Sequence, residues 1–148
     1  MIWIFLLLAF LAGAVVPLQT GINASMAKWT GGNASFASLV SFSVGTMTML
    51  VYMLVLRVPF PAMNELTKAP LWMWTAGVLG AFFIASTTVA ASKMSAALLI
   101  GLITAGQLIV ALVLDHFGWL GYEAHPINFW RIIGVALLII GVILLRQF

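Results

Sequence analysis

Residues 16–25 read V-P-L-Q-T-G-I-N-A-S and interrupt an otherwise apolar N-terminal run with closely spaced polar side chains. Hydrocarbon offers these amides and hydroxyls no hydrogen-bond partner, and an unpaired buried polar group costs roughly 1–3 kcal/mol. Pro17 also frees the carbonyl of Gly13 and tends to kink a helix. Irregular backbone at membrane depth survives only against protein or a water-filled cavity. We therefore expect this stretch to form the wall of a polar cavity around which the other helices pack.

The composition is that of an integral membrane protein. Of the 148 residues, 64% are hydrophobic and 6% are charged, and the mean hydropathy is +1.21, whereas about a quarter of the residues in a soluble domain are charged. The net charge of +3 comes from basic residues that stand singly between apolar runs. This pattern is typical of topology anchors and not of a nucleic-acid surface. The absence of cysteine excludes disulfides, Cys-based metal sites and thiol chemistry.

Five apolar segments each have close to the ~20 residues that cross a ~30 Å hydrocarbon core. The predicted spans cover residues 2–26, 33–56, 71–91, 95–114 and 129–145. The fold class is therefore expected to be all-α, with a single five-span membrane domain over residues 1–148. The first span is long enough to be tilted, or broken at Pro17. Because no positive charge precedes its apolar run, we expect an uncleaved helix and not a signal peptide.

The segments between the spans carry turn and loop signals. Residues 28–32, with two glycines, predict a tight turn. Residues 57–70 contain three prolines, so they cannot form a continuous helix. Lys93 lies in a very short link, so the third and fourth spans are expected to form an antiparallel hairpin.

Small and polar residues within the spans favour close helix approach. In the second span they form one stripe at spacings of three and four, Ser38, Ser41, Gly45, Thr48 and Tyr52. This stripe is either a packing seam or part of a binding site. The residues assigned to helix packing are Gly13, Pro17, Gly45, Gly77, Gly80, Gly101, Gly134 and Gly141.

Three amides within the spans are the strongest candidates for contact with a solute. Gln19, Asn23 and Gln107 can each donate and accept hydrogen bonds, which suits hydroxyl, amide or zwitterionic groups. Alternatively, they hydrogen-bond one another across helices, typically at about 0.6 kcal/mol each. The complete set of expected substrate-binding residues is Gln19, Asn23, Ser41, Thr104 and Gln107. A lipophilic cation is the alternative solute, held by aromatic residues such as Phe42, Phe82 and Phe83.

The sequence contains no catalytic constellation. His116 and His125 do not have the spacing of a recognised metal-ligand motif. There is no Gly-rich phosphate loop, and no embedded histidine base accompanies the serines. We therefore expect no enzyme activity, no metal and no cofactor. Asp115 is expected at the membrane interface, hydrated or paired with Arg57 or Arg131, the alternative being a coupling carboxylate with a raised pKa.

The positions of the basic residues predict dual topology. With five spans, they divide equally between the two sides, Arg57, Lys68 and Arg131 on the N-terminal side and Lys28, Lys93 and Arg146 on the other. Orientation follows the Lys/Arg bias of short loops, and here the bias is zero. We therefore expect insertion in both orientations in comparable amounts. The alternative is a single orientation set by folding or by one dominant helix.

An ordered set of short motifs runs along the chain. They are PLQ at 17–19, NA at 23–24, LVSF at 39–42, GT at 45–46, GVLGAF at 77–82, AGQL at 105–108, DHFG at 115–118, and the run from Gly134 to GVILL at 141–145. On these motifs the chain resembles the YdcZ-like family of short five-helix proteins in the drug/metabolite transporter (DMT) superfamily. The resemblance covers essentially the whole chain. Unlike the four-helix multidrug relatives, this chain has no carboxylate at the centre of a span.

The resemblance implies a multi-pass transporter of the bacterial inner membrane with dual-topology ancestry. An antiparallel homodimer would have ten helices and inverted-repeat symmetry, an architecture with binding sites near the midplane. The expected function is a secondary transporter or facilitator of a small neutral or zwitterionic metabolite, working by alternating access between antiparallel protomers. The expected partners are this solute, membrane lipid and a second copy, without nucleic acid. The alternatives are a non-transporting assembly or regulatory subunit, and multidrug or lipophilic-cation efflux.

Overall fold

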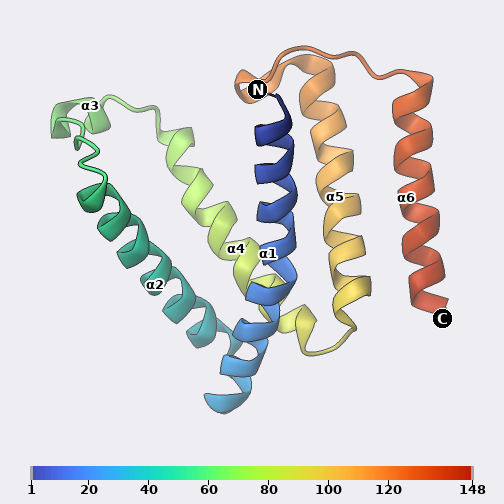
Figure 1. Ribbon diagram of the computed structural model, residues 1–148, viewed down its shortest axis with the longest axis horizontal. Coiled ribbons are helices and arrows are strands. Elements are labelled where there is room, and N and C mark those ends of the chain that lie inside the picture. Colours follow the sequence, from blue (N-terminus) through green and yellow to red (C-terminus); the bar gives the residue numbers. More distant parts are fainter. Residues whose placement is uncertain (1, 148) are drawn as a thin grey trace. The chain divides into compact units, whose positions relative to one another are not determined.

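The computed structural model describes residues 2–147, which form helices and loops without a strand. The elements are α1 (Ile2–Trp29), α2 (Ala34–Val55), α3 (Met63–Thr67), η1 (Leu71–Trp74), α4 (Thr75–Ala91), α5 (Ala96–Phe117), η2 (Trp119–Gly121) and α6 (Phe129–Gln147). Five helical segments are long and apolar enough to cross a membrane, with η1 and α4 counted as one. The prediction of an all-α chain with five spans is confirmed (Figure 1).

The helix ends differ from the predicted spans in ways that local chemistry explains. Helix α1 is continuous through Pro17, so of the two alternatives, a tilted helix or a helix broken at Pro17, the broken one is wrong. Proline removes only one hydrogen bond from the ladder. Lys28 and Trp29 belong to the last turn of α1 and not to the predicted tight turn. That turn is shorter, and its glycines Gly31 and Gly32 adopt φ values of 69° and 87°, a region that glycine enters without steric cost.

The later elements also extend or refine the prediction. The prediction that residues 57–70 do not form one continuous helix is confirmed. This loop contains the five-residue helix α3. Helix α5 runs on through Asp115 to Phe117 and ends at Gly118, whose φ of 64° makes a left-handed cap. Helix α6 continues to Gln147.

The helices fall into two compact units, one ending at Lys93 and the other beginning at Met94. In the first unit, α1, α2 and α4 each contact the other two helices. In the second unit, α5 contacts α6 and η2. Each unit is described by itself below.

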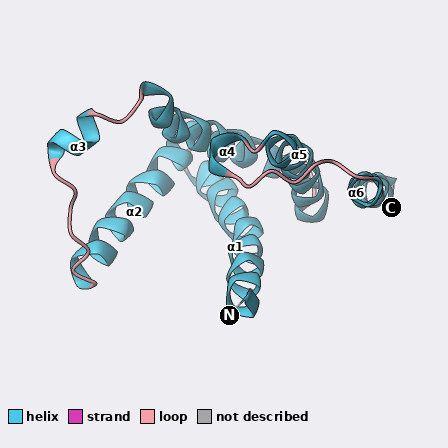
Figure 2. Cartoon of the chain, turned by 90° about the horizontal axis from the view of Figure 1, so that it is seen from above, coloured by secondary structure: helices cyan, strands magenta, loops and turns pink. Residues whose placement is uncertain are grey.

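The core of the first unit consists of small and polar residues. The residues buried there are Thr20, Asn23, Ala24, Ala27, Ala37, Ser38, Thr87 and Thr88. They lie late in α1, early in α2 and late in α4, where small side chains let helices approach closely. Figures 1 and 2 show these three helices converging at this end and diverging toward the other end. The first unit therefore has a packed end and an open end.

Large apolar side chains cover the outward faces of all five long helices. Leu7 on α1, Val44 on α2 and Leu79 on α4 are 58%, 60% and 66% exposed. Exposed apolar surface on this scale would be an aggregation liability in water. Tryptophans lie at the helix ends, including Trp72 and Trp74 before α4, the positions that suit the membrane interface. The exposed faces are therefore those of helices in hydrocarbon.

Two of the glycines assigned to helix packing lie against another helix. At Gly101 on α5, a Cβ atom would be 2.9 Å from Cγ2 of Val142 on α6. At Gly80 on α4, it would be 3.5 Å from Cζ of Phe42 on α2. Both sites are close contacts between neighbouring helices of one unit.

The other five glycines assigned to helix packing have open space at the Cβ position among the described residues. A Cβ atom would meet nothing within 4 Å at Gly13, Gly45, Gly77, Gly134 and Gly141. Gly45 and Gly134 nevertheless line spaces between neighbouring helices, and the assignment of these five glycines to helix packing stays a prediction. Pro17 is half-buried on α1.

Candidate functional site

A cavity of about 840 Å³ opens between α1, α2 and α4 of the first unit. Two of the predicted site residues, Gln19 from α1 and Ser41 from α2, line it together. Val15 lies one turn before Gln19, and Ile84 adds the contribution of α4. The structure thus brings the polar stretch of α1 and the small-residue stripe of α2 to one site.

The small-residue stripe of α2 divides between packing and cavity lining. Ser38 is buried at the packed end, where its Oγ donates to Oγ1 of Thr88 at 3.4 Å. Further along the same face, Ser41, Gly45 and Thr48 line the cavity. The stripe therefore packs against another helix at one end and lines the cavity further along.

Three polar side chains of the cavity are free to bind a solute. Within residues 2–147, Gln19, Ser41 and Thr46 form no side-chain hydrogen bond. Hydroxyls on helices usually bond back to a carbonyl one turn earlier, as the neighbouring Ser43 does to the carbonyl of Leu39 at 2.9 Å. Their donors and acceptors remain available because they face the cavity.

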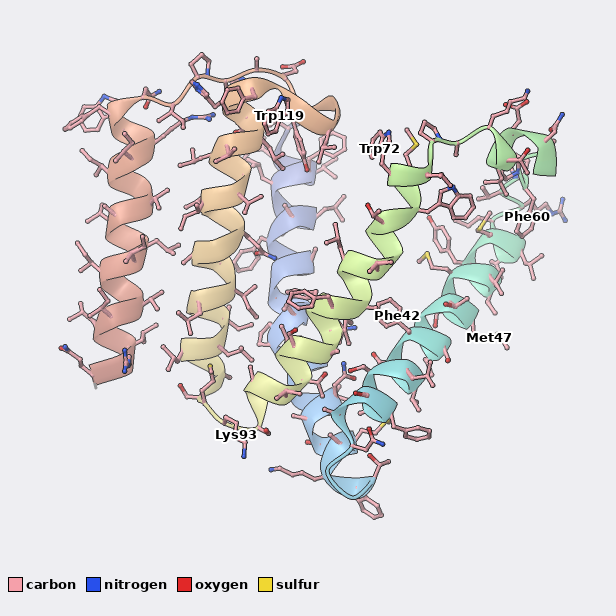
Figure 3. All side chains as sticks on the ribbon, turned by 180° about the vertical axis from the view of Figure 1, so that it is seen from behind. Phe42, Met47, Phe60, Trp72, Lys93 and Trp119 are labelled. Atoms are coloured by element: carbon pink, nitrogen blue, oxygen red, sulfur yellow. The ribbon has the colours of Figure 1, made fainter. Side chains whose placement is uncertain are left out.

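Phe42 forms an aromatic wall of this site. In Figure 3 its ring projects from α2 toward α4, where it packs over Gly80, while Met47 points away from α4. A Cβ atom at position 80 would be in ordinary van der Waals contact with the ring. Of the three aromatic residues named for a lipophilic solute, Phe42 lines this cavity.

Asn23 lies outside the cavity lining. It is one turn beyond Gln19 on α1 and is 4% exposed. Its neighbours in the packed end include Thr20, whose Oγ1 donates to the carbonyl of Pro17 at 3.1 Å. Contact between Asn23 and a solute would require the packed end to separate.

Thr104 and Gln107 lie on α5, in the second unit. Thr104 is half-buried and Gln107 is exposed. Gln107 is on a different face of α5 from Gly101, Leu108 and Asp115, which face α6. Its amide is therefore not used in the contact between α5 and α6.

Asp115 pairs with Arg131, one of the two partners that the sequence suggested. Nη1 of Arg131 lies 3.1 Å from Oδ2 of Asp115. The backbone N–H of His125 donates to the Asp115 carbonyl at 2.7 Å, and that of Ile127 donates to Nδ1 of His116 at 3.1 Å. These bonds fasten the loop between α5 and α6 to both helices.

The histidines serve this loop and are not gathered as metal ligands. In the described part of the chain, no three His, Cys, Asp or Glu side chains form a group that could hold a metal ion. His125 directs its Nδ1 at the carbonyl oxygen of Glu123, 3.0 Å away. The chemistry visible here is hydrogen bonding that holds a loop.

Sequence reasoning missed part of the cavity lining. Thr46, Met49, Leu50 and Met53 line it on α2. Met49 and Met53 continue the spacing of four that begins with Ser41 and Gly45. That periodicity could have identified them, but methionine in an apolar run is indistinguishable from a lipid-facing residue.

Comparison with known proteins gives one match. The model of a family described as "Putative inner membrane exporter, YdcZ" matches residues 4–144. No curated protein and no solved structure matches the chain.

Proposed function

Because the chain belongs to the YdcZ family of inner membrane exporters, whose model covers residues 4–144, we propose that it exports a small neutral or zwitterionic solute. It is a multi-pass protein of the inner membrane with five helices able to span it. In this proposal two antiparallel copies form a ten-helix secondary transporter, and each copy contributes its cavity.

The observation that carries the proposal is the cavity between α1, α2 and α4. Its volume of about 840 Å³ lies within the ~300–1,000 Å³ of small-molecule sites. The uncommitted side chains of Gln19 and Ser41 meet there from two different helices. Polar groups in hydrocarbon are costly and mark substrate pathways when they lack structural partners.

The two ends of the first unit suggest how access could alternate. The cavity is open where α1, α2 and α4 diverge, and it is closed where they converge. Among these three helices, the one described side-chain hydrogen bond between helices joins Ser38 and Thr88 at 3.4 Å. Such bonds contribute about 0.6 kcal/mol on average. Separation of the packed end would therefore break few bonds and would admit solvent from the opposite side.

A second, antiparallel copy would supply the inverted symmetry that alternating access uses. The equal division of six basic residues between the two sides supports insertion both ways. A transporter working as one antiparallel pair needs both orientations in equal amounts. An obligate subunit of another protein would have no such need.

The test is solute release from liposomes that contain only this chain. The liposomes are loaded with a defined mixture of amino acids, amides, polyols and uncharged amphiphilic alcohols such as tryptophol. Solutes released faster than from protein-free liposomes are identified by mass spectrometry. We expect at least one solute to be released. Loss of one hydrogen bond costs about 0.5–1.5 kcal/mol, so Ser41→Ala and Gln19→Leu should each slow release roughly 3- to 10-fold.

Ser43→Ala is the matched control, because Ser43 lies two residues from Ser41 but bonds to its own helix. It should release solute at the wild-type rate. Equal rates for Ser41→Ala, Gln19→Leu and wild type would contradict the proposed site. Release by none of the proteins, recovered only with a co-purifying protein, would favour the non-transporting subunit.

A further inference from the structure

The cavity between α1, α2 and α4 carries no charged residue. Eleven residues line it, four of them polar and seven apolar. From this lining we infer that the substrate is an uncharged amphiphile, with one hydrogen-bonding head group and an apolar body. The inference rests on the proposed function, because it concerns the ligand of the same cavity.

The polar lining residues Gln19, Ser41, Thr46 and Thr48 lie in the deep and middle parts of the cavity, and beyond Thr48 the lining contributed by α2 is apolar. Gln19 and Ser41 lie close to the packed end, since the buried residues Asn23 and Ser38 are within four positions of them. Met53 lies twelve positions after Ser41 on α2, toward the open end. At 1.5 Å per residue this separation is about 18 Å. A head group at the deep end would therefore leave its apolar body among Leu50 and the methionines.

The lining disfavours an ionic ligand of either sign. A charge taken out of water needs an opposite charge or several hydrogen bonds as compensation. The cavity offers the amide of Gln19 and a few hydroxyls, but neither a carboxylate nor an ammonium or guanidinium group. The ring of Phe42 could attract a cation, but one ring replaces only part of the lost hydration. A zwitterion would leave two charges without partners.

The lining also disfavours a strongly polar neutral ligand such as a sugar. A polyol has a hydroxyl on nearly every carbon, and each buried hydroxyl needs a partner. The flexible, polarisable side chains of Met49 and Met53 instead suit an apolar body of variable shape. A ligand with one polar head group and an aromatic or aliphatic body fits this lining. The head group would bond to Gln19 and Ser41, and the body would contact the apolar residues.

The experiment compares four indole compounds that share a ring and differ in charge. Tryptophol is uncharged with one hydroxyl, tryptamine is a cation, indole-3-propionate is an anion and tryptophan is a zwitterion at neutral pH. Binding of each tritiated compound is measured by scintillation proximity to the purified protein in lipid nanodiscs. Nanodiscs without protein correct for partition into lipid. We expect tryptophol to bind at least tenfold more tightly than each of the other three.

Site variants connect the binding to the cavity. Ser41→Ala and Gln19→Leu should each weaken tryptophol binding roughly 3- to 10-fold, because each removes one hydrogen-bonding partner. Met53→Gln should also weaken it, because a polar amide replaces part of the apolar wall. Ser43→Ala, whose hydroxyl bonds to its own helix, should bind tryptophol as the wild type does.

The outcomes separate this inference from the proposed function. One of the three charged compounds could bind as tightly as tryptophol and be weakened by Ser41→Ala. This result would overturn the inference that the ligand is uncharged but would leave the proposed exporter site intact. Binding by none of the four would also overturn it. Tight tryptophol binding together with no solute release from liposomes would support the ligand class and contradict transport.

Discussion

Nη1 of Arg131 donates to both Oδ2 of Asp115, at 3.1 Å, and the carbonyl oxygen of His125, at 3.2 Å. The two side chains of the ion pair are 30% and 31% exposed. One guanidinium therefore joins the end of α5, the following loop and the start of α6. This geometry indicates a structural clamp, because Nη1 of Arg131 on α6 bonds both to the end of α5 and to the loop between the two helices.

Asp115→Asn should leave transport within about twofold of the wild type. The amide retains an oxygen that accepts from Arg131, and partly exposed ion pairs contribute only ~0–1 kcal/mol. Initial rates of solute release from liposomes test this expectation. Complete loss of release with an unchanged unfolding temperature would contradict it and would identify Asp115 as a coupling carboxylate.

Gly101→Ala should destabilise the contact between α5 and α6. Its Cβ atom would lie 2.9 Å from Cγ2 of Val142, and overpacking typically costs about 1–3 kcal/mol. Thermal unfolding in detergent should show a lower midpoint. Val142→Ala in the same chain should recover most of the loss, because it removes the clashing methyl group.

Gly106→Ala is the control on the same helix. A Cβ atom at Gly106 meets nothing within 4 Å, and alanine is favoured over glycine inside a helix by roughly 0.5–1 kcal/mol. Its unfolding midpoint should equal or exceed that of the wild type. Equal shifts for the two glycine variants would show that α5 and α6 do not pack as described.

The hydrogen bond between Ser38 and Thr88 should contribute little to stability. A double-mutant cycle with Ser38→Ala and Thr88→Val should give a coupling energy of about 0.6 kcal/mol. The single hydroxyl proton of Ser38 is shared between Thr88 and the carbonyl of Ala34, which lies closer at 2.8 Å, and Thr88 donates its own proton to the carbonyl of Ile84 at 2.7 Å. Chemical unfolding of the four proteins measures this energy. A coupling above about 2 kcal/mol, beyond the range seen between membrane helices, would contradict an easily separated packed end.

Changing the charge balance should change the orientation of the chain. Lys93→Gln leaves three basic residues on the N-terminal side and two on the other, so more copies should insert with the N-terminal side in the cytoplasm. Lys68→Gln should shift the population the opposite way. The readout is maleimide labelling of a single cysteine placed at Ser92, in the link after α4. Identical labelling of both variants would contradict control of orientation by these charges.

The sequence alone predicted the membrane class, the five spans and two residues of the cavity. Gln19 and Ser41 could be identified from the sequence because a polar side chain within an apolar span is costly in hydrocarbon and therefore indicates a functional or structural role. The burial of Asn23 could not be predicted from the sequence. Asn23 lies only one turn of α1 beyond Gln19, yet Gln19 lines the cavity and Asn23 is buried in the packed end. Glycine periodicity predicted the contacts at Gly80 and Gly101 but did not distinguish them from glycines on open faces.

The errors at helix ends have similar physical causes. A break at Pro17 was one of two alternatives for the long first span, but the surrounding hydrogen bonds of α1 hold the helix. The predicted fourth span ends at residue 114, whereas α5 continues to Phe117, where Gly118 caps it, and its last turn carries Asp115, which pairs with Arg131. Such long-range partners cannot be read from one segment of sequence.

The proposal depends above all on two antiparallel copies, and orientation is the most direct measurement of it. The chain has no cysteine, so Ser92→Cys introduces a unique label in the exposed link without changing the charge balance. Intact cells are treated with a membrane-impermeant maleimide before and after permeabilisation. Antiparallel copies predict that about half of the protein is labelled from outside. Labelling of all or none of it would establish one orientation and would contradict the antiparallel exporter.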